Sequence, residues 1–149
     1  MTNSKLETRR ILAVDPGDKR LGIALSDPTA TLASPLTILD HKSRKNDARE
    51  IIRLAENNAA KKIVIGQALD WDGEISQQGR KAARLAAAVE QQTTIPVTLW
   101  NEYGSTNRAR KALLEMGVSR KKRNQPLDDL AATVILQSYL DAQIRKNSR

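Results

Sequence analysis

The sequence predicts an α/β domain in which helices flank a mixed β-sheet. Two patterns carry this prediction: three short strand-like segments follow one another near the N-terminus, and strand-like and helix-like segments then alternate. A meander followed by such alternation is typical of a sheet with both antiparallel and parallel strands. The chain has 149 residues, 40% of them hydrophobic, which is usual for one domain that buries its own core. We therefore expect a single domain over residues 1–149.

Five segments have strand character. Residues 11–15 form an apolar run that ends at Pro16-Gly17, and residues 21–26 form another after this turn, which predicts a hairpin. Residues 31–39 contain Pro35, which lacks a backbone donor and so would either restrict this strand to an edge of the sheet or break it. The remaining candidates are residues 62–66 and 96–100.

Four segments have helical spacing, at residues 46–58, 75–92, 105–116 and 127–144. In three of them an apolar stripe predicts the face that packs on the sheet. The stripes are Ala48, Ile51, Ile52 and Ala55; Ala82, Leu85, Ala86 and Val89; and Leu127, Leu130, Ala131 and Val134. The polar residues 1–10 and the basic residues 145–149 are expected to be flexible ends.

Composition excludes several classes of protein. The absence of cysteine excludes disulfide scaffolds and thiolate zinc sites, and a single histidine, His41, excludes a multi-histidine metal site. Apolar runs fall short of the roughly 18–20 residues of a membrane span, and the N-terminal segment is too polar for a secretory signal. We expect a cytoplasmic protein without a membrane partner.

The charge distribution favours a polyanionic partner. The net charge is +8, and from Tyr103 onward ten basic residues face four acidic ones. Such asymmetry is typical of nucleic-acid binding, although a net charge of this size also occurs in soluble domains with no such partner. Aromatic residues make up 3% of the chain, so phosphate contacts rather than base stacking would dominate binding.

Three acidic positions lie where carboxylates could converge. Asp15 ends the first strand, Glu102 follows the strand at residues 96–100, and Asp128-Asp129 open the last helix. Clustered carboxylates are the ligands that Mg²⁺ or Mn²⁺ requires, and two such ions about 3.5–4 Å apart could promote phosphodiester hydrolysis. Two of these positions also have a structural alternative: Asp15 could cap its turn, and Asp128-Asp129 are favoured at a helix N-terminus by the helix dipole.

Basic side chains lie close to these acids in the sequence. Lys19 and Arg20 follow the glycine of the first hairpin, where they could approach phosphates. Four more, Arg120, Lys121, Lys122 and Arg123, precede Asp128. The alternative for this run is a solvated loop.

Four blocks of the sequence resemble the YqgF family of Holliday-junction-resolvase-like proteins and pre-16S rRNA nucleases. They are ILAVDPGDKRLGIALSDP, IVIGQALDWDG, NEYGSTNRARKALLEMGVSRKKR and LDDLAATVILQSYLD, and they span residues 11–141 in order. The resemblance implies a ribonuclease-H-like fold, with a five-stranded mixed sheet of order 3-2-1-4-5. It also implies a Mg²⁺- or Mn²⁺-dependent nuclease whose acids are Asp15, Glu102 and Asp128, with Asp129 as the alternative third acid.

The sequence departs from the family pattern around the second acid. Asn101 and Tyr103 replace the usual Asp and Arg on either side of Glu102, and GQALDWDG lacks the common Gly-Leu-Pro start. Losing an Arg there removes a potential phosphate or transition-state contact, which affects catalytic rate more than metal binding.

Three functions follow from these residues. The first is an endonuclease on structured RNA or branched DNA, in which Lys19, Arg20, Arg108 and the run at residues 120–123 position phosphates. The second is a non-catalytic nucleic-acid-binding protein, which the altered surroundings of Glu102 favour. The third is a nucleotide-phosphate binder, because the glycine hairpin also resembles the phosphate loop of actin-like ATPases; those contain two such domains. A junction resolvase would need two active sites and hence a dimer, whereas an rRNA end-trimming nuclease could act as a monomer.

Overall fold

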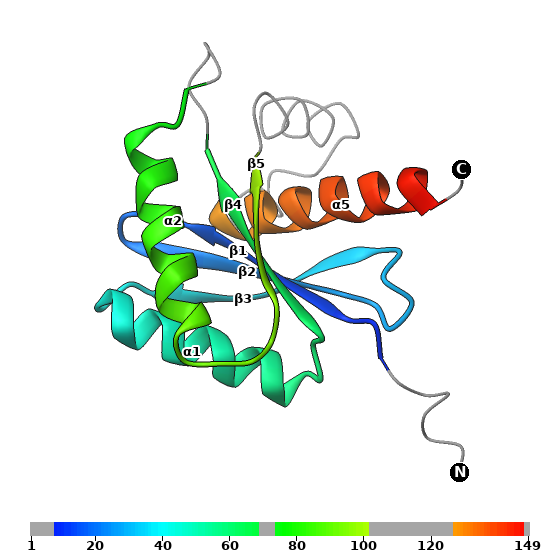
Figure 1. The fold of residues 1–149 in the computed structure, drawn as a ribbon, viewed down its shortest axis with the longest axis horizontal. Coiled ribbons are helices and arrows are strands. Elements are labelled where there is room, and N and C mark those ends of the chain that lie inside the picture. The colour runs from blue at the N-terminus through cyan, green and yellow to red at the C-terminus, as the bar shows by residue number, and fades with distance from the viewer. Residues whose placement is uncertain (1–7, 69–73, 102–126, 148–149) are drawn as a thin grey trace.

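A computed structural model describes residues 8–68, 74–101 and 127–147, with the backbone alone for residues 127–129. Within these residues, five strands form one sheet in the order β3-β2-β1-β4-β5 (Figure 1). The strands are β1 (Ile11–Pro16), β2 (Arg20–Ser26), β3 (Ala33–Asp40), β4 (Lys62–Gln67) and β5 (Val97–Asn101). The α/β class, the five strand positions and the order 3-2-1-4-5 are thereby confirmed.

The pairing of the strands makes the sheet mixed. β1 pairs antiparallel with β2, and β2 pairs antiparallel with β3. β4 runs parallel to β1 on its other side, and β5 runs parallel to β4. The carboxyl ends of β1, β4 and β5 therefore lie together at one end of the sheet, which we call its carboxyl edge to distinguish it from the edge strands β3 and β5.

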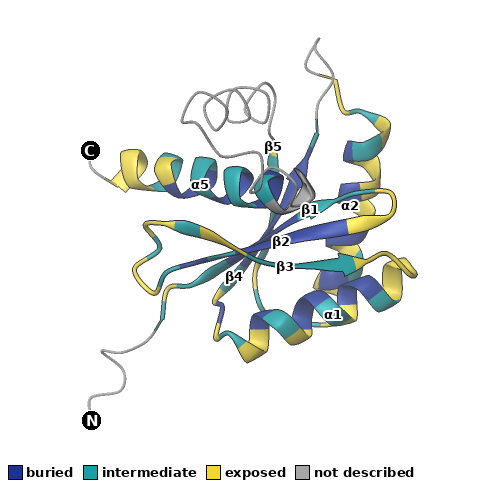
Figure 2. Cartoon of the chain, turned by 180° about the vertical axis from the view of Figure 1, so that it is seen from behind, coloured by how far each residue is buried: buried dark blue, intermediate teal, exposed yellow. Residues whose placement is uncertain are grey.

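Each face of the sheet has its own helical cover. α1 (Arg44–Asn57) and α2 (Gln77–Glu90) lie on one face, and α5 (Leu127–Asn147) lies on the other (Figures 1 and 2). Serine side chains start α1 and α2: the hydroxyl of Ser43 accepts from the amide of Asn46 at 3.1 Å, and that of Ser76 accepts from Gly79 at 2.9 Å. These bonds satisfy amides that have no partner within the helix.

The strands carry side chains of different size on the two faces of the sheet. On the face of α1 and α2 they carry large residues, which pack against both alanines and larger helix residues such as Ile51, Ile52, Leu85 and Val89. On the face of α5, the strand residues Ala13, Ala24 and Val64 pack against Ile135, Leu136, Tyr139 and Leu140. Small strand residues thus meet large helix residues on the α5 face, as dense packing of this layer requires.

The edge strand β3 behaves as its proline predicts. Pro35 pairs with Ala24 of β2, and the register shifts between Ile23 and Ala24. The turn before β3 is closed by Asp27, whose Oδ1 accepts from the amides of Thr31 at 2.8 Å and Leu32 at 2.9 Å. These amide donors, together with the Thr29 hydroxyl, hold the pKa of the Asp27 carboxyl well below its usual range.

The predicted core face of the last helix was wrong by about one residue. Leu130 and Val134 are only half-buried, whereas the residues that pack on the sheet are Ala132, Ile135, Leu136, Tyr139 and Leu140. Ala131, which the prediction included, is buried. The predicted and observed faces differ because the helix has apolar side chains on most of its sides. The small strand residues leave room for the larger helix side chains, so the face with the larger side chains packs on the sheet.

The described parts of the two ends of the chain make backbone hydrogen bonds. The amide of Arg9 donates to the carbonyl of Pro28 at 2.9 Å, and α5 continues through Arg145 and Lys146. The helix predicted at residues 105–116 lies outside the described residues. No helix in the described part of the chain is long and apolar enough to cross a membrane.

Candidate functional site

Asp15 lies at the edge of the sheet where the three parallel strands end. It is half-buried and is the second-last residue of β1. The exposed Asn101 ends β5 at the same edge and pairs with Gln67 at the end of β4. Because neighbouring strands are about 4.8 Å apart, the ends of β1 and β5 are about 10 Å apart.

The alternation of β1 puts Asp15 on the face that α5 covers. Val14 packs in the core beneath α1 and α2, whereas Ala13 packs against α5, so Asp15 shares the face of Ala13. Its partner on β2 is Gly22, and on β4 Gly66 follows the residue that pairs with Val14. Neither neighbouring strand therefore places a side chain beside Asp15 on this face.

The direction of α5 brings its first residues toward the same edge. Tyr139 packs edge-on against Trp100, with ring centres 5.2 Å apart, and its hydroxyl accepts a hydrogen bond from Lys62, the first residue of β4. Trp100 is the second-last residue of β5, so the middle of the helix crosses β5 near its carboxyl end and lies near the first residue of β4. Leu127 starts the helix twelve residues earlier, about 18 Å along its axis, near the carboxyl end of β1 (Figures 1 and 2).

Of the three acids predicted to bind metal, the structure describes the side chain of Asp15. The backbone of Asp128 and Asp129 lies in the first turn of α5, and Glu102 lies outside the described residues. Within the described part of the chain, no three His, Asp or Glu side chains are grouped to hold a metal ion. Whether the three acids meet stays a prediction.

The predicted phosphate-binding residues are divided in the same way. Lys19 and Arg20 are exposed at the β1–β2 turn, which is closed by a bond of 3.0 Å from the amide of Gly17 to the carbonyl of Arg20. The other predicted contacts lie outside the described residues: Arg108, Arg120, Lys121, Lys122 and Arg123.

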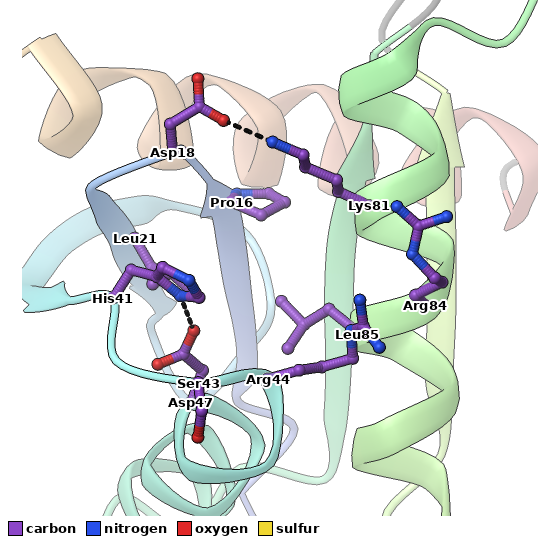
Figure 3. Close-up of a pocket in the computed structure, with 11 residues that line it drawn as sticks. Pro16, Asp18, Leu21, His41, Ser43, Arg44, Asp47, Lys81, Arg84 and Leu85 are labelled. Carbon is purple, nitrogen blue, oxygen red and sulfur yellow. Dashed lines mark hydrogen bonds and ion pairs between the residues drawn. The ribbon is translucent and has the colours of Figure 1, made fainter.

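A basic pocket that the sequence did not predict lies on the opposite face of the same edge (Figure 3). It has a volume of about 250 Å³ and lies between the β1–β2 turn, the start of α1 and the middle of α2. Its polar lining consists of Asp18, His41, Ser43, Arg44, Asp47, Lys81 and Arg84. These residues are far apart in the sequence, and the only local signal was Ser43, a typical helix-capping residue directly before Arg44.

Both carboxylates of the pocket have partners. Asp18 accepts a hydrogen bond of 2.9 Å from the ammonium of Lys81, and this bond and its charge lower the pKa of Asp18. The buried Asp47 contacts Nδ1 of His41 through one oxygen and accepts from the amide of Lys42 at 3.1 Å through the other. Neither carboxylate is therefore a bare negative charge in the pocket.

The fold is that of a ribonuclease-H-like domain. Several solved structures share this fold, and two of them illustrate it. One is titled "T. thermophilus RuvC in complex with Holliday junction substrate", with a TM-score of 0.60, 14% identity, and coverage of 91% of this chain and 95% of that chain. The other is a Fowlpox virus resolvase bound to Holliday junction DNA, with a TM-score of 0.56, 16% identity, and coverage of 90% and 98%. The predicted fold family is confirmed.

Sequence comparison defines the family. The model of the RuvX family, described as Holliday junction resolvase, matches residues 9–142. A protein of Caldanaerobacter subterraneus named "Putative pre-16S rRNA nuclease" is 39% identical over 140 residues, 93% of this chain and 99% of its own length. A protein of the same name from Syntrophus aciditrophicus is 43% identical over 133 residues, 89% of both chains. The chain belongs to the RuvX family, and its assignment to a nuclease family is confirmed.

Proposed function

We propose that this protein is a Mg²⁺- or Mn²⁺-dependent endonuclease that hydrolyses phosphodiester bonds in structured nucleic acid in the cytoplasm. Precursor 16S rRNA is the first candidate substrate because of the names of its relatives, and a four-way DNA junction is the second because of the family description. The observation that carries the proposal is the position of Asp15. It lies at the carboxyl edge of the parallel strands, on the face of α5, whose first turn contains Asp128.

The residues at this edge fit a hard divalent cation. A half-buried carboxylate supplies oxygen ligands, and the flanking Gly22 and Gly66 leave the neighbouring strand positions free of side chains. In the proposed site, Glu102 and Asp128 supply the other carboxylates, with Asp129 as the alternative to Asp128.

Each group has a distinct role in the proposed reaction. Bound metal would lower the pKa of the attacking water and stabilise the charge that develops on the leaving oxygen. Asp15, Glu102 and Asp128 hold the metal and thereby fix where the scissile phosphate lies. Lys19 and Arg20 at the adjacent turn, with Arg108 and the basic run at residues 120–123, bind neighbouring phosphates and orient the strand.

Asn101 and Tyr103 favour a second candidate function, binding without cleavage. Asn101 is exposed at the end of β5, where a family member usually has an acid, and an amide is a weaker metal ligand than a carboxylate. In this alternative the protein binds structured nucleic acid as an accessory factor. It differs from the first function in one observable property, the dependence of strand cleavage on metal.

The experiment that separates the two functions is a cleavage assay with purified protein. A labelled pre-16S rRNA fragment, a four-way DNA junction and linear duplex DNA are each incubated with Mg²⁺, Mn²⁺ or EDTA. The nuclease proposal predicts cleavage of a structured substrate with metal and none in EDTA. Asp40→Asn, which removes an exposed carboxylate from the end of β3, is the matched control and should cleave like wild type. Binding without cleavage under any metal condition would select the accessory function.

A further inference from the structure

The basic pocket between the β1–β2 turn, α1 and α2 is not used by the proposed nuclease site. Pro16 and Gly17 line it, but Pro16 follows Asp15 on β1 and so lies on the opposite face of the sheet. Asp15 lies on the side of α5, whereas the pocket lies on the side of α1 and α2. The two features share an edge of the sheet and not a cavity.

Two guanidinium groups in this pocket have no protein partner within the described residues. Arg44 and Arg84 both line the cavity, and no described side chain or carbonyl makes a hydrogen bond or ion pair with either. Figure 3 shows Arg44 extending from the start of α1 toward α2, where Arg84 and Lys81 lie. Asp18 is paired with Lys81, so Arg44 and Arg84 are the pocket cations without an ion-pair partner among the described residues, and Asp47, which contacts His41, offsets one of their charges.

The start of α1 adds to the attraction for an anion. Ser43 caps the helix and also lines the pocket, so the amino end of a 14-residue helix borders the cavity. The positive end of a helix dipole and two planar arginine forks together suit a tetrahedral oxyanion. The cavity, at about 250 Å³, is smaller than the roughly 300–1,000 Å³ of pockets that enclose a whole drug-sized ligand. A phosphate group fits within this volume.

We propose that this pocket is a phosphate-binding site, in which the guanidinium groups of Arg44 and Arg84 hold one phosphate group at the amino end of α1. The group can come from free phosphate or from the backbone of a nucleic-acid strand that crosses the sheet edge. The proposal does not depend on the nuclease function, because it requires neither metal nor cleavage.

The test is a titration of the full-length protein with inorganic phosphate in EDTA, followed through the ¹⁵N signals of the arginine Nε groups. Phosphate should shift two arginine signals that disappear in Arg44→Gln and Arg84→Gln. Chloride at equal ionic strength should not shift them. Arg44→Gln/Arg84→Gln should bind phosphate at least about tenfold more weakly, because each lost group removes a charge-assisted hydrogen bond. Both residues are exposed, so the fold should be kept, and a thermal melt checks this.

Two matched variants define the controls. Arg49→Gln removes an exposed arginine of α1 that does not line the pocket and should bind phosphate like wild type. Asp15→Asn should also bind phosphate like wild type even if cleavage is lost, which separates this proposal from the nuclease function. Equal effects of chloride and phosphate, or an equal loss of affinity in Arg49→Gln, would overturn the proposal.

A second titration identifies the source of the phosphate group. The probe is a short single-stranded oligonucleotide without terminal phosphate, again in EDTA. If it displaces inorganic phosphate and binds the double variant more weakly, the site holds a strand backbone. If it does neither while inorganic phosphate still binds, the site holds free phosphate or a terminal phosphate group. The proposal fails if neither probe shifts the signals of Arg44 and Arg84.

Discussion

Leu136→Ala tests the packing that orients α5 toward the proposed site. Leu136 is completely buried against Ala13, Ala24 and Val64 on the α5 face of the sheet. Replacing a buried leucine by alanine costs about 2–5 kcal/mol, and the cost rises when neighbours cannot close the cavity. Central strands are held by hydrogen bonds on both sides, so collapse is limited and we expect about 3–5 kcal/mol. For a chain of this size that lowers Tm by roughly 6–20 °C.

The control for this change lies on the neighbouring side of the same helix. Val134 is only half-buried, and Val134→Ala should cost about 1 kcal/mol, since two methyl groups are removed from a partly exposed site. Urea unfolding at equal protein concentration measures both changes, and the denaturant dependence should be the same for both variants. A loss in Val134→Ala as large as in Leu136→Ala would mean that the helix presents another face to the sheet. The approach of Asp128 to the edge would then lose its basis.

Three further predictions concern the turns and the basic run. A Cβ at Gly17 would lie 2.4 Å from the carbonyl oxygen of Arg20, so Gly17→Ala should distort the turn beside Asp15. A thermal melt should show a loss of about 1–3 kcal/mol in the free energy of unfolding, and cleavage should be reduced. Because the pKa of Asp27 is lowered in the folded state, its carboxylate stabilises the protein above the unfolded-state pKa of about 3.9, and this stability is lost as pH falls through the folded-state pKa. In urea melts, the free energy of unfolding of Asp27→Asn should therefore fall less below about pH 4 than that of wild type. An equal fall in both proteins would contradict this prediction. Replacing Arg120, Lys121, Lys122 and Arg123 by neutral residues should weaken binding to duplex DNA equally for all DNA sequences. The slope of the logarithm of the binding constant against the logarithm of the salt concentration should become less steep by about 3.6. An unchanged slope would mean that residues 120–123 are a solvated loop without phosphate contacts.

The strands and two helices could be predicted because their signals are local. The apolar runs of β1 and β4 are bounded by turn residues. Pro35 left two possibilities for β3, an edge strand or a broken one, and the structure shows the edge strand. In α1 and α2 polar residues surround a narrow apolar stripe, so only one face could pack on the sheet, and it does.

The face of α5 could not be predicted because its sequence does not define one. Between Leu130 and Leu136 all residues but Thr133 are apolar, and several stripes satisfy helical spacing equally well. The packed face is selected by the small side chains of Ala13 and Ala24 on two other strands. Which strand residues lie beneath the helix depends on the register of the sheet, and the spacing of apolar residues within the helix does not reveal it.

The basic pocket shows the same limit for a candidate site. Arg44, Arg84 and the turn at Gly17 come from three elements, and no motif connects them in the chain. Asp15 differs because it is an acidic residue at the end of a predicted strand and directly before a turn. The sequence alone could therefore identify it as a candidate site residue. Its predicted partnership with Glu102 and Asp128 rests on the family resemblance and stays a prediction.

The central claim is that Asp15 binds metal, and the stability of Asp15→Asn with and without metal tests it most directly. If three carboxylates lie together, removing one charge in EDTA leaves the protein equally stable or more stable, because like charges repel. At a Mg²⁺ or Mn²⁺ concentration of about 100 times Kd, wild type should gain about 2.7 kcal/mol, roughly 5–11 °C in Tm, and the variant less. A variant that is less stable than wild type in EDTA, responds equally to metal and still cleaves would make Asp15 a turn residue and contradict the proposed site.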